Sequence, residues 1–116
     1  MIYDLEDRTI KFSKELINFL KSAEQNCFNK NIIFQLIRSV TSVGANYREA
    51  NGAVSNKDFF NKISICRKEA KETEYWIELL AEASPEYKAQ LRIFWAKAHE
   101  FVLIFGTIFY SQKNKK

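Results

Sequence analysis

The sequence is short, rich in hydrophobic residues and poor in glycine and proline. It has 116 residues, of which 47% are hydrophobic and 28% charged, with three glycines and one proline. A chain of this length forms one domain, and so few Gly and Pro residues exclude a turn-rich all-β fold or a collagen-like chain. The net charge of +4 is a moderate excess that favours polyanions as partners, but it is weaker than that of a dedicated nucleic-acid arm.

Apolar residues recur at helical spacing in four segments of the chain. These segments cover about residues 5–25, 30–51, 55–83 and 85–111. Ser55 and Asp58 are typical of a capping box at the start of the third segment. Ser84 followed by Pro85 is typical of a hinge that also begins the fourth helix.

The segments that connect these helices are only a few residues long. Asp4 is the candidate N-cap of the first helix, and Asn29 or Asn31 that of the second. Because short connections make sequential helices antiparallel neighbours, the sequence predicts an all-α, up-down-up-down four-helix bundle. We expect this single domain to cover residues 1–112, followed by a basic tail at 113–116.

The cysteines and the N-terminus indicate a cytoplasmic protein. Cys27 and Cys66 form no CxxC or Cys/His pattern, so they are expected to be free thiols in a reducing compartment. The first eight residues carry three acids and no apolar run, which excludes a typical secretory signal. The most apolar stretch, Phe101–Tyr110, is about half of the roughly 20 residues that a membrane span needs, so no membrane association is expected.

The sequence lacks the residue patterns that common catalytic and metal sites require. A di-iron bundle needs Glu-x-x-His on two helices, but the chain has one histidine, His99, and Ala96 stands three positions before it. Neither a phosphate-binding Gly-rich loop nor a GxSxG motif occurs. We therefore expect a protein that is not an enzyme and that holds no metal or cofactor, with His99 facing solvent or an interface.

The third and fourth helices carry more large apolar residues than one bundle needs. A bundle helix uses about three apolar positions in seven, and leaving extra large side chains in water is unfavourable. Self-association would cover them, while a monomer with a thick aromatic core is the alternative. The interface candidates are Trp76, Trp95, Val102 and Phe109.

The second helix contains a polar segment rich in residues that are mediocre helix formers. Its small residues favour a close crossing with a neighbouring helix and a satisfied polar network, and a ligand pocket is the alternative. Asn46 and Glu49 are expected to bond polar groups on the third helix such as Lys68, Glu69 or Glu72. The residues of this motif are Arg38, Ser39, Ser42, Gly44, Asn46 and Glu49.

The positive excess lies in the second and fourth helices and in the tail. It predicts a basic surface for nucleic acid, although these charges are equally typical of a surface that is merely soluble. On the third helix, Lys68 with Glu72 and Lys71 with Glu74 are expected to pair within a solvated face. The candidate nucleic-acid-binding residues are Arg48, Lys88, Arg92, Lys97, Lys113, Lys115 and Lys116.

Two segments carry a resemblance to a known family. The stretches RSVTSVGANYREA and DFFNKISICRKEAKETEYWIELL, within Arg38–Leu80, resemble proteins encoded in intervening sequences of bacterial 23S ribosomal RNA genes. The resemblance implies a cytoplasmic bacterial four-helix bundle that often forms a homopentamer. The chain is also similar to the accessory variability protein of diversity-generating retroelements, whose basic pentamer is associated with nucleic acid and a reverse transcriptase. No catalytic residue is implied.

Together these observations predict a non-enzymatic homo-oligomer, expected to be a pentamer, that binds RNA or DNA weakly through charge. A reverse transcriptase is a further partner that the resemblance implies. The alternative is a protein-interaction or assembly scaffold that uses exposed aromatic residues and binds no nucleic acid.

Overall fold

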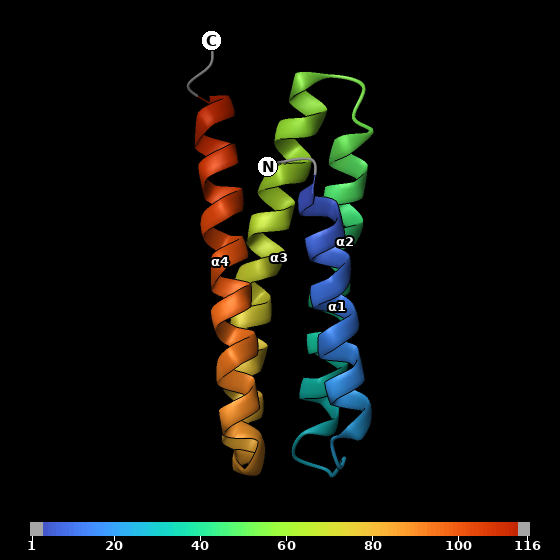
Figure 1. Ribbon diagram of the computed structural model, residues 1–116, viewed down its shortest axis with the longest axis vertical. Helices are drawn as coiled ribbons and strands as arrows, with labels where there is room; N and C mark the ends of the chain where they lie inside the picture. Colours follow the sequence, from blue (N-terminus) through green and yellow to red (C-terminus); the bar gives the residue numbers. More distant parts are fainter. Residues whose placement is uncertain (1–3, 114–116) are drawn as a thin grey trace.

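The described residues form four long α-helices, aligned along one axis, with a short 3-10 helix between the third and the fourth (Figure 1). The computed structural model describes residues 4–113, with side chains for residues 4–111. The elements are α1 (Leu5–Ser22), α2 (Lys30–Asn51), α3 (Asn56–Ala83), η2 (Pro85–Tyr87) and α4 (Lys88–Lys113). No strand occurs in the described residues, so the prediction of an all-α chain with four helices is confirmed.

The helix ends follow the sequence signals only in part. Ser55 caps α3 as predicted, because its side chain accepts a hydrogen bond from the backbone N–H of Asp58. Asp4, in contrast, makes no side-chain cap bond with α1. The first helix also ends at Ser22, about three residues earlier than predicted.

Contacts with a distant segment explain the early end of α1. The N–H of Glu24 donates a hydrogen bond to the hydroxyl of Tyr87, which lies in η2. The side chain of Asn29 donates to the carbonyl of Glu24 and to the buried hydroxyl of Ser84. Asn29 thus occupies the N-cap position of α2 but makes no cap bond, since its side chain ties two loops together instead.

Side-chain contacts show how neighbouring helices run past each other. Arg38 lies near the middle of α2 and Glu49 near its end, and they pair with Glu72 and Lys62 of α3, in reverse order along the chain. The aromatic and ionic contacts between α3 and α4 likewise connect early residues of one helix with late residues of the other. Each of these two helix pairs is therefore antiparallel, as short connections require.

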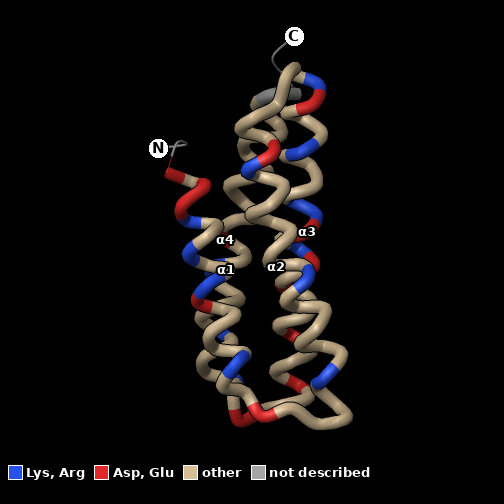
Figure 2. Tube along the Cα trace, turned by 90° about the vertical axis from the view of Figure 1, so that its right-hand side faces the viewer, with Lys and Arg blue, Asp and Glu red and all other residues tan. Residues whose placement is uncertain are grey.

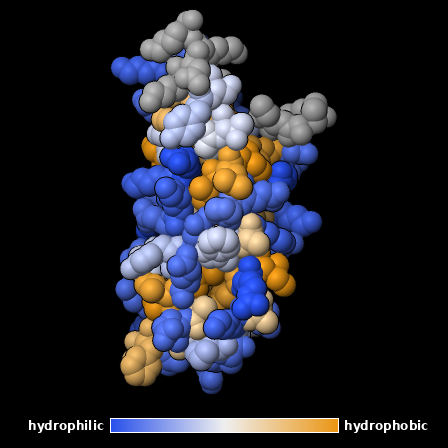
Figure 3. Space-filling view, turned by 90° about the vertical axis from the view of Figure 1, so that its left-hand side faces the viewer, coloured by the Kyte–Doolittle hydropathy of each residue, from blue (hydrophilic) through white to orange (hydrophobic). Residues whose placement is uncertain are grey.

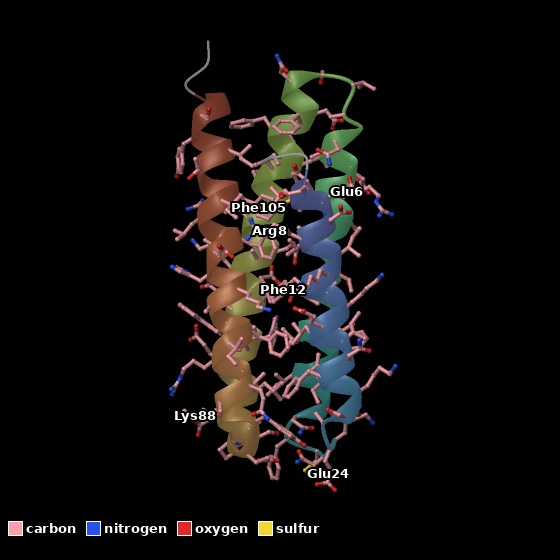
Figure 4. The ribbon with its side chains drawn as sticks, viewed as in Figure 1. Glu6, Arg8, Phe12, Glu24, Lys88 and Phe105 are labelled. Carbon is pink, nitrogen blue, oxygen red and sulfur yellow. The ribbon has the colours of Figure 1, made fainter. Side chains whose placement is uncertain are left out.

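The first helix packs differently on its two neighbours. Gly44 of α2 lies so close to α1 that a Cβ atom there would be 3.4 Å from the hydroxyl of Thr9. Toward α4 the space is filled by rings: Phe12 packs on Phe94 and Phe101, with centroids 6.3 and 5.4 Å apart. Figure 4 shows Phe12 between α1 and α4. Aromatic side chains therefore form the contact where the two backbones stay farther apart.

The fourth helix is the most apolar element. The stretch Pro85–Ser111 is long and apolar enough to cross a membrane by length and composition alone, and 28% of its most apolar window is buried. The core helix of a soluble protein passes the same test, so length and composition alone do not assign this helix to a membrane. This stretch is longer than the apolar run Phe101–Tyr110 noted in the sequence, because it also includes the polar residues that interrupt the apolar ones.

Candidate functional site

The polar motif of α2 forms a closed network with α3. The hydroxyls of Ser39 and Thr73, both fully buried, lie 3.0 Å apart. Nearer the surface, the guanidinium of Arg38 bridges Glu69 and Glu72, and the Glu69 side chain is only 9% exposed. The small residue at position 39 thus permits the close crossing that the sequence predicted.

That prediction is wrong for Asn46, and for Glu49 the helix is confirmed but the partner differs from the examples given. Asn46 does not reach α3, because its amide donates to the carbonyl and hydroxyl of Ser42 one turn earlier in α2. Glu49 does reach α3, but its partner is Lys62, at 2.7 Å, and none of the three residues expected. Arg38, and not Asn46 or Glu49, therefore bonds Glu69 and Glu72 of α3.

The acids of α3 turn away from the lysines of their own helix. Glu72 pairs with Arg38 of α2, and Glu74 lies 2.9 Å from the Nδ1 atom of His99 in α4. The expected pairs Lys68–Glu72 and Lys71–Glu74 do not form, because neighbouring helices offer these carboxylates better-placed partners. Both lysines are exposed and make no ion pair with any described residue.

A basic stripe follows from this arrangement on the outer side of α3. Arg67, Lys68 and Lys71 line a shallow depression of about 440 Å³. We call these three residues the α3 stripe; Ser64, Glu72 and Tyr75 complete the lining of the depression. Figure 2 shows basic and acidic residues alternating along the outer edge of α3. Local spacing in the sequence does not reveal this site, because acids that could pair with Lys68 and Lys71 stand three or four residues away on the same helix.

Arg67 is held in place by α4. Its guanidinium lies 5.7 Å from the ring centroid of Tyr110, a cation–π contact. A Cβ atom at Gly106 would be 3.4 Å from the Nε atom of Arg67, so the absence of a side chain at Gly106 gives the arginine room. That Nε atom is buried and has no hydrogen-bond partner among the described residues. Arg67 lines the depression together with Lys68.

Farther along the outer seam of α3 and α4 lies a small apolar pocket of about 160 Å³. Ile77, Ala81 and Leu91 form its apolar lining, and Trp95 closes one side. The indole N–H of Trp95 donates to Glu78 at 2.9 Å, and its ring stacks on His99 at 4.9 Å. His99 is thus a partly buried structural residue that contacts both Trp95 and Glu74.

The predicted nucleic-acid-binding residues do not share one surface. Arg48 and Lys97 are engaged in ion pairs with Glu6 and Glu15 of α1, each at 3.0 Å. Hydrogen bonds from Asn51 and from Arg48 lower the pKa of the Glu6 carboxyl, which is consistent with a charge that is used inside the chain.

Two of the other predicted basic residues, Lys88 and Arg92, make no such pair with a described residue. Lys88 and Arg92 lie one turn apart on α4 and line the apolar pocket, without an ion pair to any described residue. Lys88 lies near the lower end of α4 in Figure 4, on the side away from α1. The side chain of Lys113 and residues Lys115 and Lys116 lie outside the described part, although α4 extends to Lys113.

The predicted interface residues pack mostly within the chain. Val102 is only 8% exposed and lies in the core, while Trp76, Trp95 and Phe109 are partly buried against it. Other apolar side chains are more accessible: on α4, Ile93 is 60% and Leu103 is 58% exposed. Figure 3, which faces α4, shows hydrophobic patches between hydrophilic side chains.

The two cysteines occupy different environments. Cys27 is exposed in the loop after α1, whereas Cys66 is fully buried and its thiol lies 3.6 Å from the carbonyl of Val43. Burial raises the pKa of the Cys66 thiol to about 12, so this group stays protonated and unreactive. Within residues 4–113 no cluster of His, Cys, Asp or Glu could hold a metal ion.

The fold and this surface define a small helical protein that presents unpaired cations along one helix. Over residues 3–102 the sequence matches the family of 23S rRNA-intervening sequence proteins, and the chain belongs to this family. The resemblance seen in the sequence is thereby confirmed. No curated protein matches the chain.

A solved structure gives the same assignment. The chain is similar to a protein of unknown function from the S23 ribosomal protein family of Bacteroides thetaiotaomicron VPI-5482. The two share 34% sequence identity, with 90% of this chain and 96% of the other covered, and the TM-score is 0.77. This similarity supports the fold and the family.

Proposed function

We propose that this chain is a cytoplasmic, non-enzymatic, up-down-up-down helical bundle that self-assembles and binds nucleic acid through the α3 stripe. The observation that carries the proposal is a set of three cations, Arg67, Lys68 and Lys71, that line one open depression and make no ion pair with a described residue. Glu72 and Glu74, the acids that local spacing offers to Lys68 and Lys71, pair with α2 and α4 instead. The stripe therefore keeps its positive charge available for an anion.

The stripe suits a phosphate backbone better than a single small anion. Residues 67 and 71 are four positions apart, which is about 6 Å along the helix axis. The depression is shallow and broad, so a ligand can extend across it. Because nucleic acids carry closely and regularly spaced phosphates, three cations in a row are expected to displace counterions from consecutive phosphates. Such binding depends on charge and not on base sequence.

Self-assembly is supported by the apolar surface of α4. Ile93 and Leu103 lie on its outer side and are more than half exposed, which is unfavourable in water unless another chain covers them. The seam that carries the α3 stripe lies beside this surface. A pentamer, which the resemblance implies, would multiply the +4 of one chain fivefold to +20 and strengthen its field.

A charge-reversal experiment tests nucleic-acid binding. The variant Lys68→Glu with Lys71→Glu reverses two exposed lysines three residues apart, and Lys11→Glu with Lys14→Glu makes the same change on α1. We expect the α3 variant to lose at least tenfold in affinity for RNA or DNA at about 50 mM salt, and the α1 variant to lose far less.

The affinity of the wild-type chain should also fall steeply as salt rises. Equal losses in both variants would show that net charge alone matters and would reject the α3 stripe. If the wild-type chain binds neither RNA nor DNA, the nucleic-acid function is rejected, and a protein scaffold becomes the better account.

Light scattering tests assembly separately. Five chains of 13.6 kDa give a particle of about 68 kDa, and adding RNA should raise the mass further. Leu103→Lys places a charge on the outer side of α4 and should lower the mass toward one chain. A wild-type mass of 13.6 kDa at micromolar concentration would reject self-assembly.

A further inference from the structure

We infer that the apolar pocket between α3 and α4 takes one unpaired base of a single-stranded nucleic acid, with its phosphate held by Lys88 and Arg92. This inference rests on the proposed nucleic-acid function and adds that the preferred partner is single-stranded. It joins two features that the α3 stripe does not use: an indole beside an apolar pocket, and two unpaired cations that line it.

Trp95 is fixed as a stacking surface. The hydrogen bond from its Nε1 atom to Glu78 and its stacking on His99 restrain the ring from two directions. His99 lies one turn after Trp95 in α4, whereas the pocket residues Leu91 and Arg92 lie one turn before it. His99 and these pocket residues therefore lie on opposite sides of Trp95 along α4, so a ligand in the pocket can stack on the indole face away from His99.

The size and lining of the pocket indicate a small flat ring. Its volume of about 160 Å³ is below the roughly 300–1,000 Å³ of sites for drug-sized ligands. Ile77, Ala81 and Leu91 provide an apolar surface beside the indole. Stacking of a base on an aromatic side chain is a general mode of single-strand binding and tolerates any base sequence.

The charges around the pocket place the phosphate. Lys88 and Arg92 make no ion pair with a described residue, so both can bind an anion. Glu78 uses one carboxylate oxygen for Trp95, and the other can accept a hydrogen bond from a base amino group such as that of cytosine. A phosphate near Glu78 would be repelled, which orients the nucleotide with its phosphate toward the two cations.

The pocket and the α3 stripe can serve one strand. Ala81 and Lys71 are ten residues apart on α3, about 15 Å along its axis, within reach of a strand a few nucleotides long. A base inside a duplex is stacked on its neighbours and cannot enter such a pocket without being extruded. The pocket thus adds a preference for single strands to binding by charge.

Tryptophan fluorescence tests the inference, because Trp76→Phe leaves Trp95 as the only tryptophan. The probes are a single-stranded oligocytidine about a dozen nucleotides long, a duplex of the same length and cytidine monophosphate. We expect the oligocytidine to quench Trp95, the duplex to bind without quenching, and the mononucleotide to act only at much higher concentration. Quenching by the mononucleotide at the same concentration would overturn the assignment to a strand.

Affinity measurements on pocket variants complete the test. In the otherwise unchanged chain, Trp95→Leu should reduce the preference for single strand over duplex at least tenfold while leaving duplex affinity unchanged, and Trp95→Phe should restore most of it. Lys88→Glu with Arg92→Glu should weaken single-strand binding more than Lys11→Glu with Lys14→Glu.

The two proposals can fail separately. If the wild-type chain binds single strand and duplex equally and Trp95→Leu changes neither, the pocket inference is overturned while the α3 stripe stands. If the chain binds no nucleic acid, the proposed function itself fails, and the pocket inference fails with it.

Discussion

The two sides of α3 differ in whether their charged side chains have ion-pair partners within the chain. Toward α2, Arg38 pairs with both Glu69 and Glu72, and the hydroxyls of Ser39 and Thr73 share a hydrogen bond, so these polar groups have partners inside the chain. On the outer side, Lys68 and Lys71 have no acidic partner among the described residues. The same helix thus stabilises the fold with one face and leaves the other for an anion, and each prediction below tests one side of this contrast.

The largest effect is expected from removing a core side chain of α3. Leu80 is fully buried, so Leu80→Ala should destabilise the fold by about 2–5 kcal/mol through lost burial and a cavity. Leu79→Ala is the matched control, since Leu79 is partly exposed and lies outside the core cluster. Urea denaturation measures both variants, and equal losses would contradict the assignment of the two faces.

A large side chain at the close crossing should have the next largest effect. Ser39→Leu puts three more carbons against Thr73, where neither residue has exposed area, and should cost about 1–3 kcal/mol. Thr41→Leu, at an exposed position of the same helix, should change the free energy of unfolding by less than about 0.5 kcal/mol. Thermal unfolding of both variants compares them, and an unchanged Ser39→Leu would mean that α2 and α3 do not need the small residue.

Alkaline pH should weaken the fold through Cys66. Burial raises the pKa of its thiol from 9.0 to about 12, so the folded chain holds this proton more tightly than the unfolded chain. The stabilisation is complete below pH 9 and falls by up to about 1.4 kcal/mol per pH unit as the pH rises from 9 toward 12. Denaturation at several pH values measures the slope.

Cys66→Ala should flatten this slope but not abolish it. Burial also raises the pKa of the Tyr47 hydroxyl, which therefore contributes a loss of the same sign. A slope that Cys66→Ala leaves unchanged would show that the thiol is not responsible.

The smallest effect is expected from the ion pairs. Arg38→Met leaves the nearly buried Glu69 without its cation and should cost roughly 1 kcal/mol, because the arginine itself is 41% exposed. Arg48→Met removes a pair whose arginine is 67% exposed, and no measurable loss is expected. Chemical denaturation of both variants should rank them in this order, and the reverse order would contradict the closed network between α2 and α3.

Local signals in the sequence were reliable where no other element competed for the same atoms. Ser55 caps α3 because the donor, the N–H of Asp58, is three residues away in the same chain segment. The helix stripes were also predicted well, since the buried Ile63, Cys66 and Ala70 follow the expected spacing. Periodicity alone decides which side of a helix is apolar.

The candidate site could be predicted only in part. Lys88, Arg92 and Trp95 were identified as candidates, but nothing in their sequence positions indicated that they line one pocket. Local spacing predicts ion pairs for Lys68 and Lys71, because acids stand three or four residues away, the usual distance for a pair within one helix. The neighbouring helices supplied competing partners, Arg38 and His99, that local spacing does not reveal.

The sequence by itself determined that this chain is a four-helix protein of its family, because apolar periodicity and the two motifs depend only on the order of residues. Tertiary structure alone decided which charges are used inside the chain and which are free. A carboxylate on α3 can pair with a cation of its own helix or of either neighbouring helix, and the packing geometry decides which pair forms. The lysines of the α3 stripe are left without acidic partners because Glu72 pairs with Arg38 of α2 and Glu74 with His99 of α4.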